Sequence, residues 1–124
     1  MRGALVWKSI GILALVISLS GCLGDLCGNE IVSDTPEQAG RVRAIVFVRD
    51  CGATTGFSTQ VSILDEKQSV PNEPGNTFVA HDRLSVSVRW TAPDRLVVTY
   101  PAQAKVFLQE NQLKAVKVSY EQTH

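Results

Sequence analysis

The feature that most restricts the fold of this chain is a two-residue alternation of apolar and polar side chains. It is clearest in RLSVSVRW, residues 83–90, where Leu84, Val86, Val88 and Trp90 share one face. Ser85, Ser87 and Arg89 occupy the opposite face. Only an extended strand has this period, so the segment predicts a half-buried strand with Val86, Val88 and Trp90 directed inward.

The same alternation recurs along the rest of the chain. TAPDR carries turn residues and leads into LVVTY, which predicts a hairpin with the strand at 83–90. A second hairpin is predicted where ENQ separates KVFLQ from LKAVKVSY. Residues 102–113 are the one helical candidate, but their apolar residues do not keep a 3.6-residue period. Further strands are predicted at 41–50 and 57–64, which gives about six or seven short strands in all. The sequence therefore predicts a mostly antiparallel β domain over residues 41–124, either a small sheet or a sandwich.

The first 21 residues differ in kind from this domain. Arg2 and Lys8 precede an almost wholly apolar run, and no acidic residue occurs before Asp25. This layout is typical of a secretory signal peptide. An uncleaved membrane anchor starting at Ala4 is the alternative, although the run is short for a span of about 20 apolar residues.

The end of this leader, Leu19-Ser20-Gly21-Cys22, resembles the lipobox of bacterial lipoproteins. The resemblance implies that Cys22 receives a diacylglycerol, that residues 1–21 are removed, and that the new N-terminus is acylated, for instance with palmitate. Leu23 stands where an aspartate would signal retention in the inner membrane. The resemblance therefore implies the periplasmic face of the outer membrane in a Gram-negative host.

Two cysteines remain if Cys22 carries lipid. Export places Cys27 and Cys51 in an oxidising compartment, which favours a disulfide between them. Residues 22–40 lack an apolar period and are predicted to be a lipidated N-terminus and irregular tether, which must fold back along 41–50 to bring the cysteines together. The alternatives are a zinc site with His81 and His124, or a nucleophilic Cys51 with His81 as base.

The CGATTG loop, residues 51–56, is the most function-like connection in the sequence. Gly52 and Gly56 permit positive backbone angles, while Thr54 and Thr55 offer hydroxyl and amide groups to an anion. The loop lacks the Lys-Ser/Thr ending of a nucleotide phosphate loop. A tight turn beside a disulfide is the alternative interpretation.

One further resemblance covers most of residues 27–120. The block RDCGATTGFSTQVSIL, the segment VPNEPGN and the strand pair around Trp90 and Tyr100 together resemble an uncharacterised family of small bacterial proteins with a CGATTGFSTQVSI motif. This resemblance supports the domain boundaries and implies no activity, cofactor or catalytic residue.

Together these features predict a membrane-anchored envelope lipoprotein that acts as a non-catalytic binding or structural module. Its partners would be membrane lipid, through Cys22, and another envelope protein. The twelve basic and twelve acidic residues include no polybasic stretch, which argues against nucleic acid as a partner. No cofactor or metal is predicted. Two alternatives remain, a periplasmic enzyme inhibitor that uses the 51–56 loop and a thiol-dependent hydrolase that uses Cys51 and His81.

Overall fold

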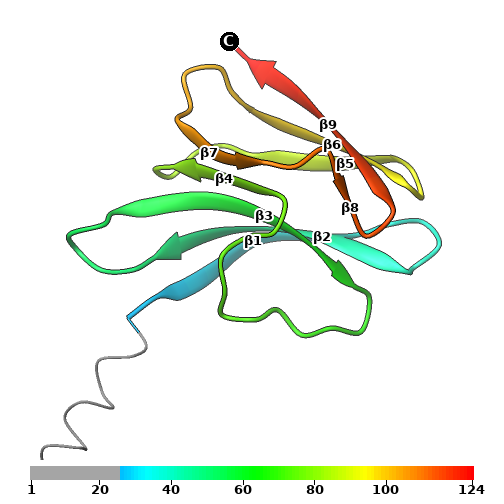
Figure 1. The fold of residues 1–124 in the computed structure, drawn as a ribbon, viewed down its shortest axis with the longest axis horizontal. Coiled ribbons are helices and arrows are strands. Elements are labelled where there is room, and N and C mark those ends of the chain that lie inside the picture. Colours follow the sequence, from blue (N-terminus) through cyan, green and yellow to red (C-terminus); the bar gives the residue numbers. More distant parts are fainter. Residues whose placement is uncertain (1–25) are drawn as a thin grey trace, which may run out of the picture.

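The computed structural model describes residues 26–124, and the regular structure in this part of the chain is entirely β (Figure 1). The leader and Cys22 lie outside the described residues. The first sheet has the order β1-β2-β3-β4-β7 and comprises β1 (Gly28–Pro36), β2 (Val42–Asp50), β3 (Phe57–Asp65), β4 (Phe78–His81) and β7 (Val106–Gln109). The second sheet has the order β5-β6-β9-β8 and comprises β5 (Ser87–Ala92), β6 (Arg95–Pro101), β8 (Gln112–Leu113) and β9 (Val116–Thr123). Residues 26–124 contain no helix long and apolar enough to cross a membrane.

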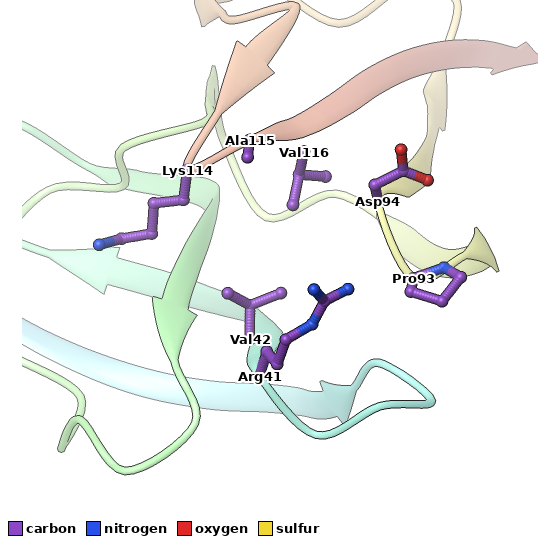
Figure 2. A pocket seen from close by; sticks show the side chains of 7 residues that line it. All are labelled: Arg41, Val42, Pro93, Asp94, Lys114, Ala115 and Val116. Carbon is purple, nitrogen blue, oxygen red and sulfur yellow. The ribbon is translucent and has the colours of Figure 1, made fainter.

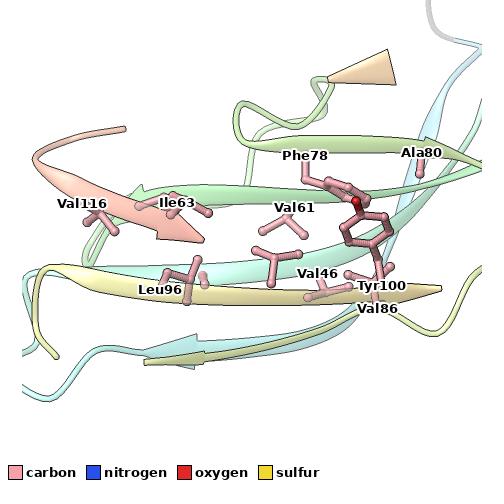
Figure 3. Close-up of a cluster of buried hydrophobic side chains, with 12 residues drawn as sticks. Val46, Val61, Ile63, Phe78, Ala80, Val86, Leu96, Tyr100 and Val116 are labelled. Carbon is pink, nitrogen blue, oxygen red and sulfur yellow. The ribbon is translucent and has the colours of Figure 1, made fainter. Parts of the chain in front are cut away.

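The two sheets pack against each other around one hydrophobic core (Figure 3). The first sheet supplies Val46, Val61 and Phe78, and the second supplies Leu96 and Tyr100, all of them buried. The predicted β domain is therefore confirmed as a small two-layer sandwich.

Strand β2 is buried on both faces. Ala44 and Val46 point into the core between the sheets, whereas Ile45 and Phe47 point to the outer face of the first sheet and pack with Val70. Val70 belongs to the long connection at residues 66–77. This connection covers the outer face, which explains why the arginine-flanked run 41–50 has apolar residues on both sides of its alternation.

The 66–77 connection is held to β3 by side-chain hydrogen bonds. Asn76 accepts a hydrogen bond from the backbone N–H of Ile63 and donates one to its carbonyl, both at 2.9 Å. The N–H of Gly75 donates to Oε1 of Gln60 at 2.6 Å. A Cβ at Gly75 would lie 2.8 Å from the carbonyl oxygen of Val61, so only glycine allows this close approach.

The predicted hairpin around TAPDR is confirmed. β5 pairs antiparallel with β6, and Val86, Val88 and Trp90 are directed toward the core as expected. The indole N–H of Trp90 donates to the carbonyl of Thr35 at 2.9 Å, which links the second sheet to β1.

The segment predicted as an irregular tether is instead largely a strand. β1 pairs antiparallel with β2 from Gly28↔Asp50 to Pro36↔Arg43, so ordered β structure begins at Gly28 and not at residue 41. The required fold-back along 41–50 is thus present, in the form of a hairpin. β1 is an edge strand with a bulge after Ile31, and both features remove the regular alternation that marks strands in sequence.

The predicted hairpin between residues 105–109 and 113–120 is wrong. β7 joins the first sheet beside β4, whereas β9 joins the second sheet and runs parallel to β6. β9 forms its short hairpin with β8 instead. The second sheet is consequently mixed, which corrects the expectation of antiparallel pairing at this strand.

A buried carboxylate organises the turn between β1 and β2. The side chain of Glu37 is inaccessible to solvent and accepts hydrogen bonds from the backbone N–H groups of Arg41 at 2.6 Å and Ala39 at 2.8 Å. These bonds, with the nearby Arg41 guanidinium, lower the pKa of Glu37 against the opposing effect of desolvation. The turn therefore depends on the ionised carboxylate.

We expect this turn to make the domain sensitive to acid. Because the pKa of Glu37 is lowered in the folded protein, its stabilising contribution is complete above the unfolded pKa and is lost as pH falls through the folded value. Glu37→Gln should lower stability at neutral pH and flatten the loss of stability on acidification. Urea denaturation measured across a pH series would test this, and parallel pH profiles for the two proteins would contradict it.

Candidate functional site

A disulfide closes one end of the sandwich. It joins Cys27 to Cys51, whose Cα atoms are 3.9 Å apart, within the limit of about 7 Å for such a bond. The two cysteines lie one position beyond the last β1–β2 pair, Gly28↔Asp50. The disulfide predicted from the cysteine count is therefore confirmed.

The VPNEPGN segment also braces this end. Nδ2 of Asn72 donates to the carbonyl of Cys27 at 2.9 Å, and Arg49 donates to the side-chain oxygens of both Asn29 and Asn72. The first residues of the domain are thus held by a covalent bond and by a set of hydrogen bonds from two other elements.

The 51–56 loop is exposed and internally hydrogen-bonded. Gly52 and Gly56 have φ values of 111° and 69°, which agrees with the role predicted for these glycines. Both the N–H and the hydroxyl of Thr55 donate to the carbonyl of Gly52 at 3.3 Å, so this hydroxyl serves the turn. The N–H of Gly52 donates to Oδ1 of Asp50 at 3.0 Å. This arrangement is that of a tight turn, while Thr54 remains exposed to solvent.

The loop borders a shallow cleft of about 290 Å³ on the outer face of the first sheet. We refer to it as the disulfide-end cleft. Its walls include Cys51, Thr55, Gly56, His81 and Phe107. The imidazole of His81 meets the ring of Phe107 edge to face, with the centroids 6.4 Å apart. The structure thus brings together the loop and the histidine that the sequence singled out separately.

The residues that line the disulfide-end cleft offer little acid–base or nucleophilic chemistry. The sulfur of Cys51 is bonded to Cys27 and is not available as a thiolate in this form. Among residues 26–124, no three His, Cys, Asp or Glu side chains are placed to hold a metal ion. The disulfide-end cleft presents mainly aromatic and aliphatic surface around one imidazole.

A second cleft, of about 500 Å³, lies at the opposite end of the sandwich (Figure 2). We refer to it as the distal cleft. Three turns meet there, the β1–β2 turn with Arg41, the β5–β6 turn with Pro93 and Asp94, and the β8–β9 turn with Lys114 and Ala115. Its walls combine apolar side chains with charged side chains of both signs.

The two cationic side chains of the distal cleft already lie near carboxylates. Nζ of Lys114 is 3.6 Å from Oδ1 of Asp65, and Nε of Arg41 is 3.8 Å from Oε1 of Glu37. The cleft therefore has little spare positive charge for an isolated anion. A mixed polar surface of this kind is typical of the rim of a protein–protein contact.

No pattern in the sequence indicates the distal cleft. Lys114 and Ala115 both adopt positive φ, 49° and 63°, in a two-residue turn that usually requires Asn-Gly or a similar pair. Because neither residue type signals such a turn, the hairpin and the cleft beside it were not visible in the sequence. Strained backbone at non-glycine residues often marks functional sites. This turn therefore supports the distal cleft as a candidate functional site.

The fold and its two clefts define a small, disulfide-closed β sandwich with a mostly apolar cleft at one end and a cleft of mixed polarity at the other. Comparisons of the chain with protein-family models, with curated proteins and with solved structures find no match.

Proposed function

We propose that this protein is a lipid-anchored module of the bacterial cell envelope that binds another envelope component without chemistry of its own. One observation carries the proposal. The disulfide between Cys27 and Cys51 accounts for two of the three cysteines, and the third, Cys22, is the residue at which the lipobox-like sequence predicts lipid attachment.

The disulfide also supports an oxidising location. Such bonds persist in the periplasm and on cell surfaces but are rare in the reducing cytosol. The positively charged, apolar leader gives the route by which the chain would be exported. Stable attachment needs more than one acyl chain, and the diacylated cysteine implied by the lipobox resemblance meets that requirement.

A binding role is better supported than the thiol-hydrolase alternative. That alternative requires a reduced Cys51 within hydrogen-bond reach of His81, but the sulfur of Cys51 is paired and His81 packs against Phe107. The distal cleft is the candidate contact for an envelope partner, because its turns lie at the end of the sandwich opposite the disulfide, and Cys22 is only five positions from Cys27 in the sequence.

We expect the full chain, expressed in a Gram-negative host, to incorporate labelled palmitate and to appear in the membrane fraction with an acylated Cys22 N-terminus. Cys22→Ser should lose the label completely and yield an unprocessed or released protein, because the acceptor thiol is gone. Intact mass and membrane fractionation measure both effects.

Cys27→Ser is the matched control. It removes another cysteine, and with it the disulfide, but leaves the lipobox residues unchanged, so we expect it to retain the palmitate label. An unmodified Cys22 in the membrane fraction, or label retained by Cys22→Ser, would overturn the proposed function.

A further inference from the structure

We infer that the disulfide end of the domain lies against the phospholipid bilayer and that exposed aromatic side chains there enter the headgroup region. This inference rests on the proposed lipidation of Cys22. It adds an orientation of the folded domain and a second, non-covalent contact with lipid.

Only a short length of chain separates the proposed anchor from the fold. Cys27 is fixed to the domain by its disulfide and by the hydrogen bond from Asn72. Five residue steps separate Cys22 from Cys27, and a fully extended chain of this length spans at most about 18 Å. The disulfide end therefore cannot leave the vicinity of the bilayer.

Exposed apolar side chains are concentrated at the disulfide end of the domain. Of the five large hydrophobic residues exposed within residues 26–124, three lie at this end: Leu26 is 68% exposed, Phe57 36% and Phe107 59%. The other two, Ile31 and Val32, lie on edge strand β1. The large apolar side chains exposed outside β1 thus gather at the end of the sandwich that the proposed anchor holds near lipid.

These aromatic rings lie beside cations. The guanidinium of Arg83 lies 4.2 Å from the ring centroid of Phe57, and Nζ of Lys105 lies 5.5 Å from that of Phe107. Arg83 also lies 3.4 Å from Oε2 of Glu30, and both side chains of this ion pair are exposed to solvent. Aromatic rings at the acyl boundary with neighbouring Lys or Arg heads among the phosphates are the usual composition of an interfacial contact. We call Leu26, Phe57, Arg83, Lys105 and Phe107 the membrane rim.

The members of this rim are contiguous on the surface. Phe57 and Phe107 line the disulfide-end cleft. Leu26 and Arg83 line a neighbouring hollow that also includes the carboxylates of Glu30 and Asp50. The backbone carbonyl of Lys105 accepts a hydrogen bond from the N–H of His81, which places this lysine beside the same cleft. One flat bilayer surface is thus a suitable partner for the whole rim.

A protein partner fits this end less well. A globular domain of about 100 residues has a radius of gyration near 13 Å and is therefore more than about 26 Å wide. It would not fit in a gap of at most about 18 Å between the β domain and the bilayer. The short linker by itself holds the membrane rim close to the bilayer, so lipid is the partner that this surface meets. The exposed 51–56 loop then faces lipid, which argues against its use as an enzyme-inhibiting loop.

The test uses the processed, full-length lipoprotein in vesicles of phosphatidylcholine brominated on its acyl chains. Phe107→Trp and Phe57→Trp place a fluorophore in the rim, and the parent protein supplies the emission of the native Trp90 to be subtracted. We expect the emission of both variants to shift to shorter wavelength and to lose most of its intensity relative to vesicles of unbrominated lipid.

Lys67→Trp is the matched control, because Lys67 is exposed on the turn after β3, at the end of that strand opposite Phe57. Its emission should be unchanged by the bromine. Circular dichroism of each variant verifies the β fold, and Phe57→Trp and Phe107→Trp test the same surface independently.

Vesicle flotation and the mass of the N-terminal residue are measured on the same samples. Protein that does not float, or that has an unmodified Cys22, overturns both the proposed function and this inference. Protein that floats with an acylated Cys22 but shows equal quenching at positions 67 and 107, or none at either, overturns the bilayer-facing orientation alone.

Discussion

Replacing both disulfide cysteines, Cys27→Ala with Cys51→Ala, is expected to lower the free energy of unfolding by about 2–5 kcal/mol. The bond closes a loop with a sequence separation of 24 residues. For a loop of this size, the restriction of the unfolded chain alone corresponds to about 3.5 kcal/mol. Domains of this size have a total stability of about 5–15 kcal/mol, so the loss would be a large share.

The effect should be greatest at the edge of the first sheet. β1 is an edge strand and contacts β2 along one side only, so its N-terminal half depends on the disulfide and on the hydrogen bonds from Asn72 and Asn29. Amide hydrogen exchange should therefore show faster exchange in β1 than in β3 when the bond is removed. Urea denaturation of a secreted chain that starts at Leu23, with no lipid attached, measures the overall loss.

Reduction of the parent domain is the control for this experiment. Because the chain from Leu23 onward has no third cysteine, reduction should reproduce the stability of the double variant. A double variant that matches the oxidised parent in stability would show that the hydrogen-bonded hairpin needs no covalent bond.

The strands recovered from sequence are those with one regular pattern of burial. In β5 the exposed and partly buried residues alternate without interruption, and in β3 the residues directed into the core, such as Val61 and Ile63, occur at every second position. In both strands burial alternates every two residues, as the side-chain direction does along an extended backbone. Period-two patterning is a direct consequence of that geometry.

β1 was missed because its environment has no such period. Most of its residues are exposed, and the bulge between Ile31 and Ser33 shifts the two halves of the strand relative to each other. What did predict its position was the disulfide, which required this segment to return along β2. A long-range covalent constraint thus carried information that the local pattern lacked.

The pairing of β7, β8 and β9 could not be predicted from local sequence patterns, for a different reason. An alternating segment indicates a strand, but it does not indicate which of two sheets the strand joins. The choice depends on contacts between distant residues, such as the bond from the N–H of Glu110 to the carbonyl of Thr77 and the parallel ladder between β6 and β9. The disulfide-end cleft also depends on contacts between distant residues, because it forms only where Phe107 lies beside His81.

Phe78→Ala is expected to lower the free energy of unfolding by about 3–5 kcal/mol, the usual cost of removing a buried aromatic ring. Phe78 is fully buried in β4, and its ring lies 5.1 Å from that of Tyr100 and 5.9 Å from that of Tyr120 (centroid to centroid). Both tyrosines belong to the second sheet (Figure 3 shows Phe78 facing Tyr100). The substitution therefore opens a cavity where the two sheets meet.

Two variants make this prediction specific to packing. Phe78→Leu keeps more of the apolar volume and should lower the free energy of unfolding by less than Phe78→Ala does. Phe107→Ala removes an equal ring from a side chain that is 59% exposed, so its effect on stability should be about 0.5 kcal/mol or less. Urea denaturation of the three variants measures these differences. Equal losses for Phe78→Ala and Phe107→Ala would mean that the interface between the sheets is not centred on Phe78.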